Sequence, residues 1–137
     1  MKKRLTYLII PLITLILEIL PYGAVCNFAR PATDGSIGHF REHYSYFDLT
    51  PFGYANFAPL ITALFTCIAL ILLLIYCFTG RIGAAKAAKT ILCIAAVISF
   101  GPLMLGFRFY SVVGGLISLS LIAGFVILAG SLKAQND

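Results

Sequence analysis

The residue with the clearest chemical potential in this sequence is a single carboxylate inside a long apolar segment. Glu18 follows an uncharged run that begins at Leu5. At a helical rise of about 1.5 Å per residue, Glu18 would lie roughly 20 Å from the start of that run. A carboxylate in hydrocarbon needs a cationic partner, or else it hydrogen-bonds as a neutral acid. We predict that Arg108 is this cationic partner. The alternative is that the Arg108 side chain extends to the outer lipid headgroups.

The residues around Glu18 predict which way its side chain points. Mildly polar residues recur at spacings of three or four and would share one face of a helix: Tyr7, Pro11, Thr14, Glu18 and Tyr22. A polar stripe of this kind is expected to face other helices and not lipid.

A second group with chemical spacing is the sequence His39-Phe40-Arg41-Glu42-His43. On a helix, two imidazoles one turn apart bind zinc, and an intervening glutamate acts as a base. Here the motif stands in a short segment without a supporting domain. A chance occurrence of the motif, or interfacial hydrogen bonding by the two histidines, is therefore favoured, with His39 and His43 kept as weak metal candidates. No motif predicts a cofactor, and we expect no enzymatic activity.

The elements that must position these residues are long apolar segments. Hydrophobic residues make up 61% of the 137-residue chain and charged residues 11%, against about a quarter charged in ordinary globular domains. Because a helix of about 20 apolar residues crosses a bilayer, we expect an all-α, polytopic membrane protein. Its single domain, residues 1–137, would be a compact bundle of four transmembrane helices at about 5–25, 59–79, 90–106 and 112–132.

The distribution of the net charge of +5 predicts the orientation of the chain. Seven basic residues precede the first span, lie in the connector 80–89 or follow the last span: Lys2, Lys3, Arg4, Arg81, Lys86, Lys89 and Lys133. Basic residues gather on the cytoplasmic side of membrane proteins, so both termini are expected there. We therefore expect these residues to contact lipid headgroups, not nucleic acid. Small size and charge asymmetry favour a bacterial cytoplasmic membrane.

The outer segment 27–58 is the only sizeable stretch outside these spans. Phe40, Tyr44 and Phe47 recur in it at helical spacing, which predicts a short interfacial helix between the first two spans. These aromatic side chains would anchor the segment in the interface, or they would form an outer surface that binds another membrane protein.

Small residues predict where the last span packs. Six of them recur at spacings of four: Ser111, Gly114, Gly115, Ser118, Ser120 and Gly124. Small residues at this spacing let two helix backbones approach closely. They predict packing of the third and fourth spans within one bundle, with a homodimer through the fourth span as the alternative.

Four spans, a short chain and Glu18 in the first span together make the chain similar in shape to the small multidrug resistance exporters. The resemblance implies a dimer in which Glu18 exchanges protons for cationic compounds. The chain differs from those exporters in its long 27–58 segment and in having no tryptophan. We therefore expect a non-enzymatic accessory, immunity-like or scaffolding membrane protein that presents its outer segment. The alternative is a small oligomeric, proton-coupled transporter that uses Glu18.

Overall fold

The computed structural model describes residues 2–31, 36–49 and 56–134, and it is 70% helical. Its elements in chain order are α1 (Lys2–Ile19), β1 (Ala24–Pro31), β2 (Ile37–Tyr44), α2 (Ala58–Thr79), α3 (Ile82–Ser99), α4 (Gly101–Met104), the 3-10 helix η1 (Phe107–Phe109) and α5 (Val112–Lys133).

Three helical stretches are long and apolar enough to cross a membrane. They are Ala58–Thr79, Ile82–Met104 and Val112–Lys133, with mean hydropathies of 2.8, 1.8 and 2.5. These three stretches agree with the predicted membrane character. The first and last of them match the predicted bounds of the second and fourth spans. α1 is not among the three, because its 18 residues include three basic side chains as well as Glu18. It also ends at Ile19, short of the predicted end at residue 25.

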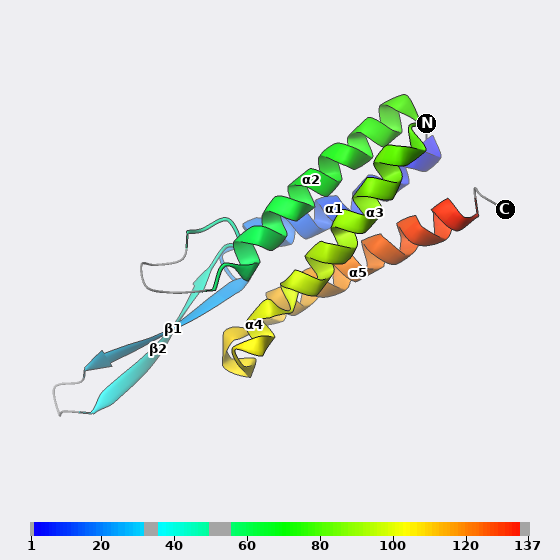
Figure 1. The fold of residues 1–137 in the computed structure, drawn as a ribbon. Helices are drawn as coiled ribbons and strands as arrows, with labels where there is room; N and C mark the ends of the chain where they lie inside the picture. Colours follow the sequence, from blue (N-terminus) through cyan, green and yellow to red (C-terminus); the bar gives the residue numbers. More distant parts are fainter. Residues whose placement is uncertain (1, 32–35, 50–55, 135–137) are drawn as a thin grey trace.

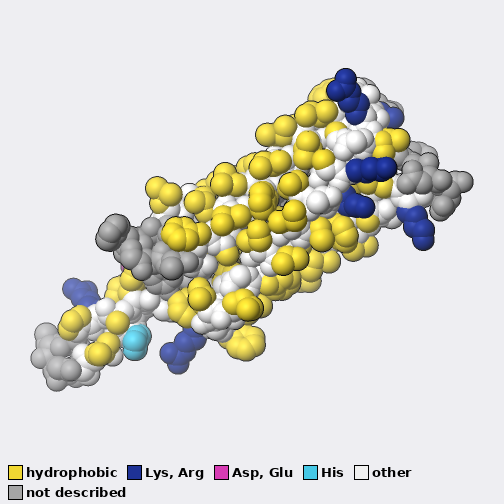
Figure 2. Space-filling view, in the orientation of Figure 1, with side chains coloured by type: hydrophobic (Ala, Val, Ile, Leu, Met, Phe, Trp, Pro, Cys, Tyr) yellow, Lys and Arg dark blue, Asp and Glu magenta, His cyan; other side chains and the backbone are white. Residues whose placement is uncertain are grey.

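The four long helices lie side by side, and neighbours run in opposite directions (Figure 1). α1 packs against α2 and α5, and α3 packs against the same two helices. Both termini lie at one end of the helices, and the two strands extend beyond the other end. Figure 2 shows hydrophobic side chains along the helices, with Lys and Arg side chains gathered at the end that holds the termini.

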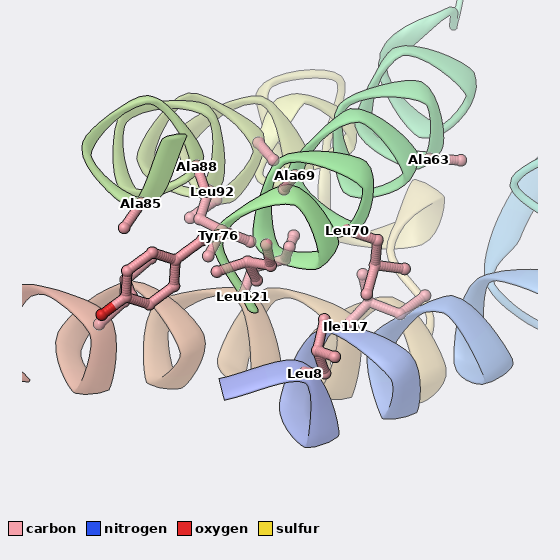
Figure 3. Close-up of a cluster of buried hydrophobic side chains, with 14 of the residues drawn as sticks. Leu8, Ala63, Ala69, Leu70, Tyr76, Ala85, Ala88, Leu92, Ile117 and Leu121 are labelled. Carbon is pink, nitrogen blue, oxygen red and sulfur yellow. The ribbon is translucent and has the colours of Figure 1, made fainter. Parts of the chain in front are cut away.

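The interior is filled by aliphatic side chains from all four long helices (Figure 3). Leu73 of α2, Leu92 of α3 and Leu121 of α5 are at most 1% exposed. Ala85, Ala88 and Ala95 of α3 are fully buried. Because an alanine side chain is only a methyl group, these positions let α3 lie close to α2, its main neighbour.

The turn between α2 and α3 corrects the predicted connector. Helix α3 begins at Ile82, so the connector is Gly80–Arg81 and not residues 80–89. Residues 82–89 contain four alanines, which are the strongest helix formers. Gly80 makes the tight turn possible, because it adopts a left-handed φ of 69° and donates its N–H to the Tyr76 carbonyl at 2.9 Å.

The predicted interfacial helix is wrong. β1 and β2 form an antiparallel hairpin in which Phe28 pairs with Phe40 and Asn27 with Arg41. The rings of Phe28 and Phe40 stack with centroids 5.3 Å apart. A spacing of four places two residues on one face of a helix, but also on one face of a strand. Phe40 and Tyr44 therefore fit both structures, and pairing with β1 decides between them. The fold is helical with a two-stranded sheet, not all-α.

Candidate functional site

Glu18 lies in the last turn of α1 and is completely buried. The hydroxyl of Thr66, on α2, donates to Glu18 Oε1 at 2.8 Å. Among the residues that the structure describes, Oε2 of Glu18 has no hydrogen-bond partner. Pro11 and Thr14 of the predicted polar stripe are buried too, whereas Tyr22, beyond the helix, is exposed. The stripe within α1 thus faces the other helices, as the spacing predicted.

The structure does not bring Glu18 and Arg108 together. Arg108 is exposed in η1, and its carbonyl accepts a hydrogen bond from Asn27 Nδ2 at 3.3 Å. Pairing would have required α1 and α3 to be neighbours, but the main contacts of α1 are with α2 and α5. The carboxylate therefore meets a threonine hydroxyl of α2 in place of the predicted guanidinium.

A buried tyrosine that follows β2 attaches the hairpin to the end of α1, at the Glu18 backbone. Tyr46 is 1% exposed, and its N–H donates to the Glu18 carbonyl at 2.9 Å. A Cβ at Gly23 would lie 2.8 Å from the Tyr46 ring, so the ring needs a glycine at that position. Burial of the phenol raises the pKa of Tyr46. This contact was not predicted from the sequence, in which the Pro21-Tyr22-Gly23 break after the first span is the available signal.

Ser111 fixes the other side of this attachment. Its hydroxyl donates to the Gly23 carbonyl at 2.6 Å and accepts from the Gly114 N–H at 2.8 Å, so it caps α5 and holds the start of the hairpin at once. A Cβ at Gly114 would lie 3.2 Å from the same carbonyl. Two of the predicted packing residues therefore contact the hairpin root and not α3.

Three of the other predicted packing residues contact α3, α1 or both, and the fourth, Gly115, contacts neither. Ser99 of α3 donates to Ser118 at 2.8 Å, and Ser120 shares a 2.7 Å hydrogen bond with Thr14 of α1. Gly124 lies beside Ile10 and Pro11 of α1 and Leu92 of α3, and Gly115 lies beside the Tyr110 ring. These residues are thus used within one chain. The homodimer through α5 stays a prediction.

His39 and His43 are exposed on β2. Four residues along a strand span about 13 Å, too far for two ligands of one zinc ion at about 2 Å each. Glu42 lies on the opposite face, where it accepts the Tyr44 hydroxyl at 2.5 Å. The described residues hold no group of three or more His, Cys, Asp or Glu that could bind a metal. The spacing of His39 and His43 suits zinc only if they lie on a helix, and they lie on a strand instead.

The two faces of the hairpin carry different charges. Residues paired across the strands share a face, so His39, Arg41 and His43 lie on one side together with Val25, Asn27 and Ala29. We call this side the cationic face. Nη2 of Arg41 donates to the Tyr110 carbonyl at 3.2 Å, which ties this face to the chain beside Arg108.

The opposite face holds Phe28, Phe40, Glu42 and Tyr44, and also Arg30 near the far end of β1. Glu42 raises the pKa of Tyr44 to about 12 by accepting its hydroxyl proton in a hydrogen bond. Of the predicted aromatic surface, Phe40 and Tyr44 share this face, and Phe47 follows in a turn after β2. The three do not form the single helical face that was predicted.

Comparisons with protein-family models, with curated proteins and with solved structures give no match to this chain.

Proposed function

We propose that this protein is a non-catalytic membrane protein that crosses the bilayer four times and presents the hairpin Ala24–Tyr44 outside as a contact surface for another protein. Such a protein would have an accessory, immunity-like or scaffolding role. The observation that carries the proposal is the exposure of β2, where Ile37–His43 are all exposed beyond the end of the helices (Figure 1). The histidine pair, the one group with catalytic spacing in the sequence, is spread along this strand.

The fourth crossing is supported by the way α1 lies along α2. Near the start of α1, the Arg4 guanidinium lies 5.3 Å from the centre of the Tyr76 ring, and Tyr7 lies 6.4 Å from it. Near the end of α1, Glu18 meets Thr66. Because α2 is long and apolar enough to span a membrane, α1 would occupy the same layer.

The residues after α1 would complete this crossing. An 18-residue helix is about 27 Å long, slightly less than a hydrocarbon core of about 30 Å. Non-helical backbone at membrane depth is tolerated only where protein surrounds it. The root of the hairpin meets this condition, since Val25 is 0% and Cys26 3% exposed, and Tyr46 and Ser111 hold it in place.

The contact role is supported by the contrast between the root and the tip of the hairpin. A two-stranded hairpin is only marginally stable in water on its own. The root at Ala24–Cys26 is buried against the helices, whereas Ala29, Arg30 and Pro31 are as exposed as the paired residues of β2. A protein surface of this kind, with an aromatic pair and guanidinium groups, has the composition of a binding site.

Site-specific photo-crosslinking in the native membrane tests this function. A photoreactive residue is placed at Phe40 on the hairpin, or at Val97, which is 70% exposed on α3. We expect a crosslinked protein of one defined size from Phe40 and none of that size from Val97. Crosslinks of equal pattern from both positions, or none from Phe40, would refute the contact role.

A second candidate function is favoured by the unpaired Oε2 of Glu18. Buried polar atoms rarely lack a partner, and those that do often belong to functional sites. A small proton-coupled transporter could use this carboxylate, provided that another conformation opens it to water. Purified protein in liposomes that enclose a pH-sensitive dye tests this. In the wild type, uptake of an added cationic dye should export protons from the liposome, which the enclosed pH-sensitive dye reports. Glu18→Gln should export no protons, whereas Glu42→Gln should behave as the wild type. Absence of coupled flux in the wild type would reject the transporter.

A further inference from the structure

The two edges of the hairpin differ in what covers them. At the root, β1 forms a bridge from Ala24 to Tyr110, and η1 contacts the same strand. Among the residues that the structure describes, β2 pairs only with β1, so its other edge has no neighbouring strand. This edge is seven exposed residues long, from Ile37 to His43.

An open edge of this length is a template for strand addition. It presents backbone N–H and C=O groups that an extended segment can pair with, and several binding domains recognise peptides in this way. Proteins usually protect long edges with a cover, a bulge or a proline. Pro31 lies on β1, at the far end of the other strand, and leaves the β2 edge open.

The cationic face argues against a second copy of the chain as the added strand. If two copies joined through their β2 edges, the two-fold axis would be perpendicular to the sheet, because each copy uses the same edge. The cationic faces would then lie on the same side, so the Arg41 guanidinium groups of the two copies would face each other across the new strand pair. Like charges directly opposite each other destabilise a strand pair.

The direction of the hairpin argues against a lipid surface as the occupant. The strands continue away from the helices and do not fold back over them (Figure 1). If the helices span a membrane, most of the β2 edge points away from the headgroups. The charges favour an acidic protein segment instead, because the two acidic side chains described on or just after β2, Glu42 and Asp48, are already engaged, with the Tyr44 hydroxyl and the Ser45 N–H.

We propose that the free edge of β2 accepts an extended acidic segment of a partner protein as a third strand, with alternate carboxylates of that segment against His39, Arg41 and His43. Alternate side chains of a strand lie on one face, so acidic residues at every second position would meet this set. The inference rests on the proposed contact function and names the chemistry of the partner.

Peptide binding to the purified full-length chain, in nanodiscs of zwitterionic lipid at physiological salt, tests the inference. The probe is a fluorescent ten-residue peptide of alternating Glu and Val. The matched control replaces every Val by Pro, which keeps the charge but removes half of the backbone donors and cannot lie in a central strand. We expect the Glu-Pro peptide to bind at least about tenfold more weakly, because several backbone hydrogen bonds are lost.

Two charge-reversal variants test whether peptide binding depends on the cationic face or only on the net charge of the hairpin. Arg41→Glu reverses a charge on the cationic face and should weaken binding of the Glu-Val peptide by about tenfold or more, by repulsion and loss of a charge-assisted contact. Arg30→Glu makes the same change on the opposite face of β1 and should leave the affinity within about twofold, since screening limits charge effects to about 8 Å. Arg41→Lys keeps the charge and should bind as the wild type. This last variant also controls for loss of the Arg41–Tyr110 contact.

Three outcomes would overturn the inference: equal binding of the Glu-Val and Glu-Pro peptides, equal loss in the two charge reversals, or displacement of the peptide by anionic phosphatidylglycerol vesicles. The first two would indicate charge alone, and the third a lipid surface. If the peptide does not bind but the Phe40 crosslink persists, the contact function holds and the strand addition fails. If the crosslink is also absent, the contact function fails as well.

Discussion

At the scale of single residues, the hydrogen bond between Thr66 and Glu18 joins two helices at a buried position. If Thr66→Val removes the hydroxyl, neither carboxylate oxygen of Glu18 keeps a hydrogen-bond donor among the described residues. Leaving a buried polar group unsatisfied costs about 1–3 kcal/mol. We expect a loss of this size in the free energy of unfolding, measured by denaturant titration in detergent micelles.

Thr62→Val is the matched control for this prediction. Thr62 is as deeply buried, but its hydroxyl donates only to the Ala58 carbonyl of its own helix. Its removal should cost less than the change at Thr66. Glu18→Leu in the Thr66→Val background should recover part of the loss, because the unsatisfied carboxylate is gone. Equal losses at the two threonines would show that the Glu18 contact does not stabilise the fold.

The hydrogen bond between Tyr44 and Glu42 predicts a pH dependence at high pH. The neutral phenol donates to the carboxylate, and tyrosinate would lose that bond and repel it, so the folded pKa is raised to about 12. Unfolded tyrosine titrates near 10. The stabilisation is therefore complete below about pH 10 and is lost as the pH rises through about 12.

Ultraviolet titration of tyrosinate measures this effect. The difference between the wild type and Tyr44→Phe isolates one tyrosine among seven. We expect its midpoint to fall towards 10 in Glu42→Gln. A midpoint that does not move would mean that Glu42 does not hold the phenol.

At the scale of elements, the attachment of the hairpin to the helices depends on close contact at Gly23. Gly23→Ala would place a methyl group 2.8 Å from the buried Tyr46 ring, so the ring or the strand must move. Overpacking of this kind costs about 1–3 kcal/mol. We expect a lower free energy of unfolding and faster proteolysis of the hairpin.

Gly83→Ala is the matched control, because it makes the same chemical change in α3, where no described atom beyond the adjacent residues and the helix's own backbone lies within 4 Å of the new methyl group. Alanine favours helices over glycine by about 0.5–1 kcal/mol. Stability should be unchanged or slightly raised, and the hairpin should be cut at the wild-type rate. Faster hairpin cleavage in Gly83→Ala would contradict the local role of Gly23.

The elements also show what the sequence could and could not predict. The bounds of α2 and α5 followed from apolar length alone, since a span of about 20 apolar residues is a strong local signal. The hairpin was missed because β1 begins inside the run assigned to the first span, where Ala24, Val25 and Cys26 suit a helix in hydrocarbon equally well. The partner of Phe40 is Phe28, 12 residues earlier, and no local pattern reveals that pairing.

The same limit applies to Glu18. Its inward direction was predictable from the polar stripe, because helical periodicity is local. Its partner was not, because the choice between Arg108 and Thr66 depends on which helix lies next to α1. That order depends on the packing of small residues such as Gly124, whose neighbours Ile10 and Leu92 come from helices far apart in the chain.

At the scale of the whole molecule, the charges at its two ends predict its orientation. Arg4, Arg81, Lys86, Lys89 and Lys133 lie where the helices begin or end near the termini. Among the described residues, the hairpin end carries Arg30, Arg41 and Arg108 together with Glu42 and Asp48, so the charges there nearly balance. Basic residues favour the cytoplasmic side, and we expect the hairpin to lie outside.

Labelling with a membrane-impermeant maleimide tests this orientation and the fourth crossing together. In a background without the native cysteines, His39→Cys should react in intact cells, whereas Lys86→Cys should react only after permeabilisation. Lys2→Cys decides whether α1 crosses the bilayer: it lies at the far end of α1 from the hairpin and should behave like Lys86→Cys. External labelling at both Lys2 and His39, with Lys86 protected, would leave α2, α3 and α5 as the only crossings. External labelling of Lys86→Cys with His39→Cys protected would place the hairpin in the cytoplasm, which is incompatible with an extracellular partner.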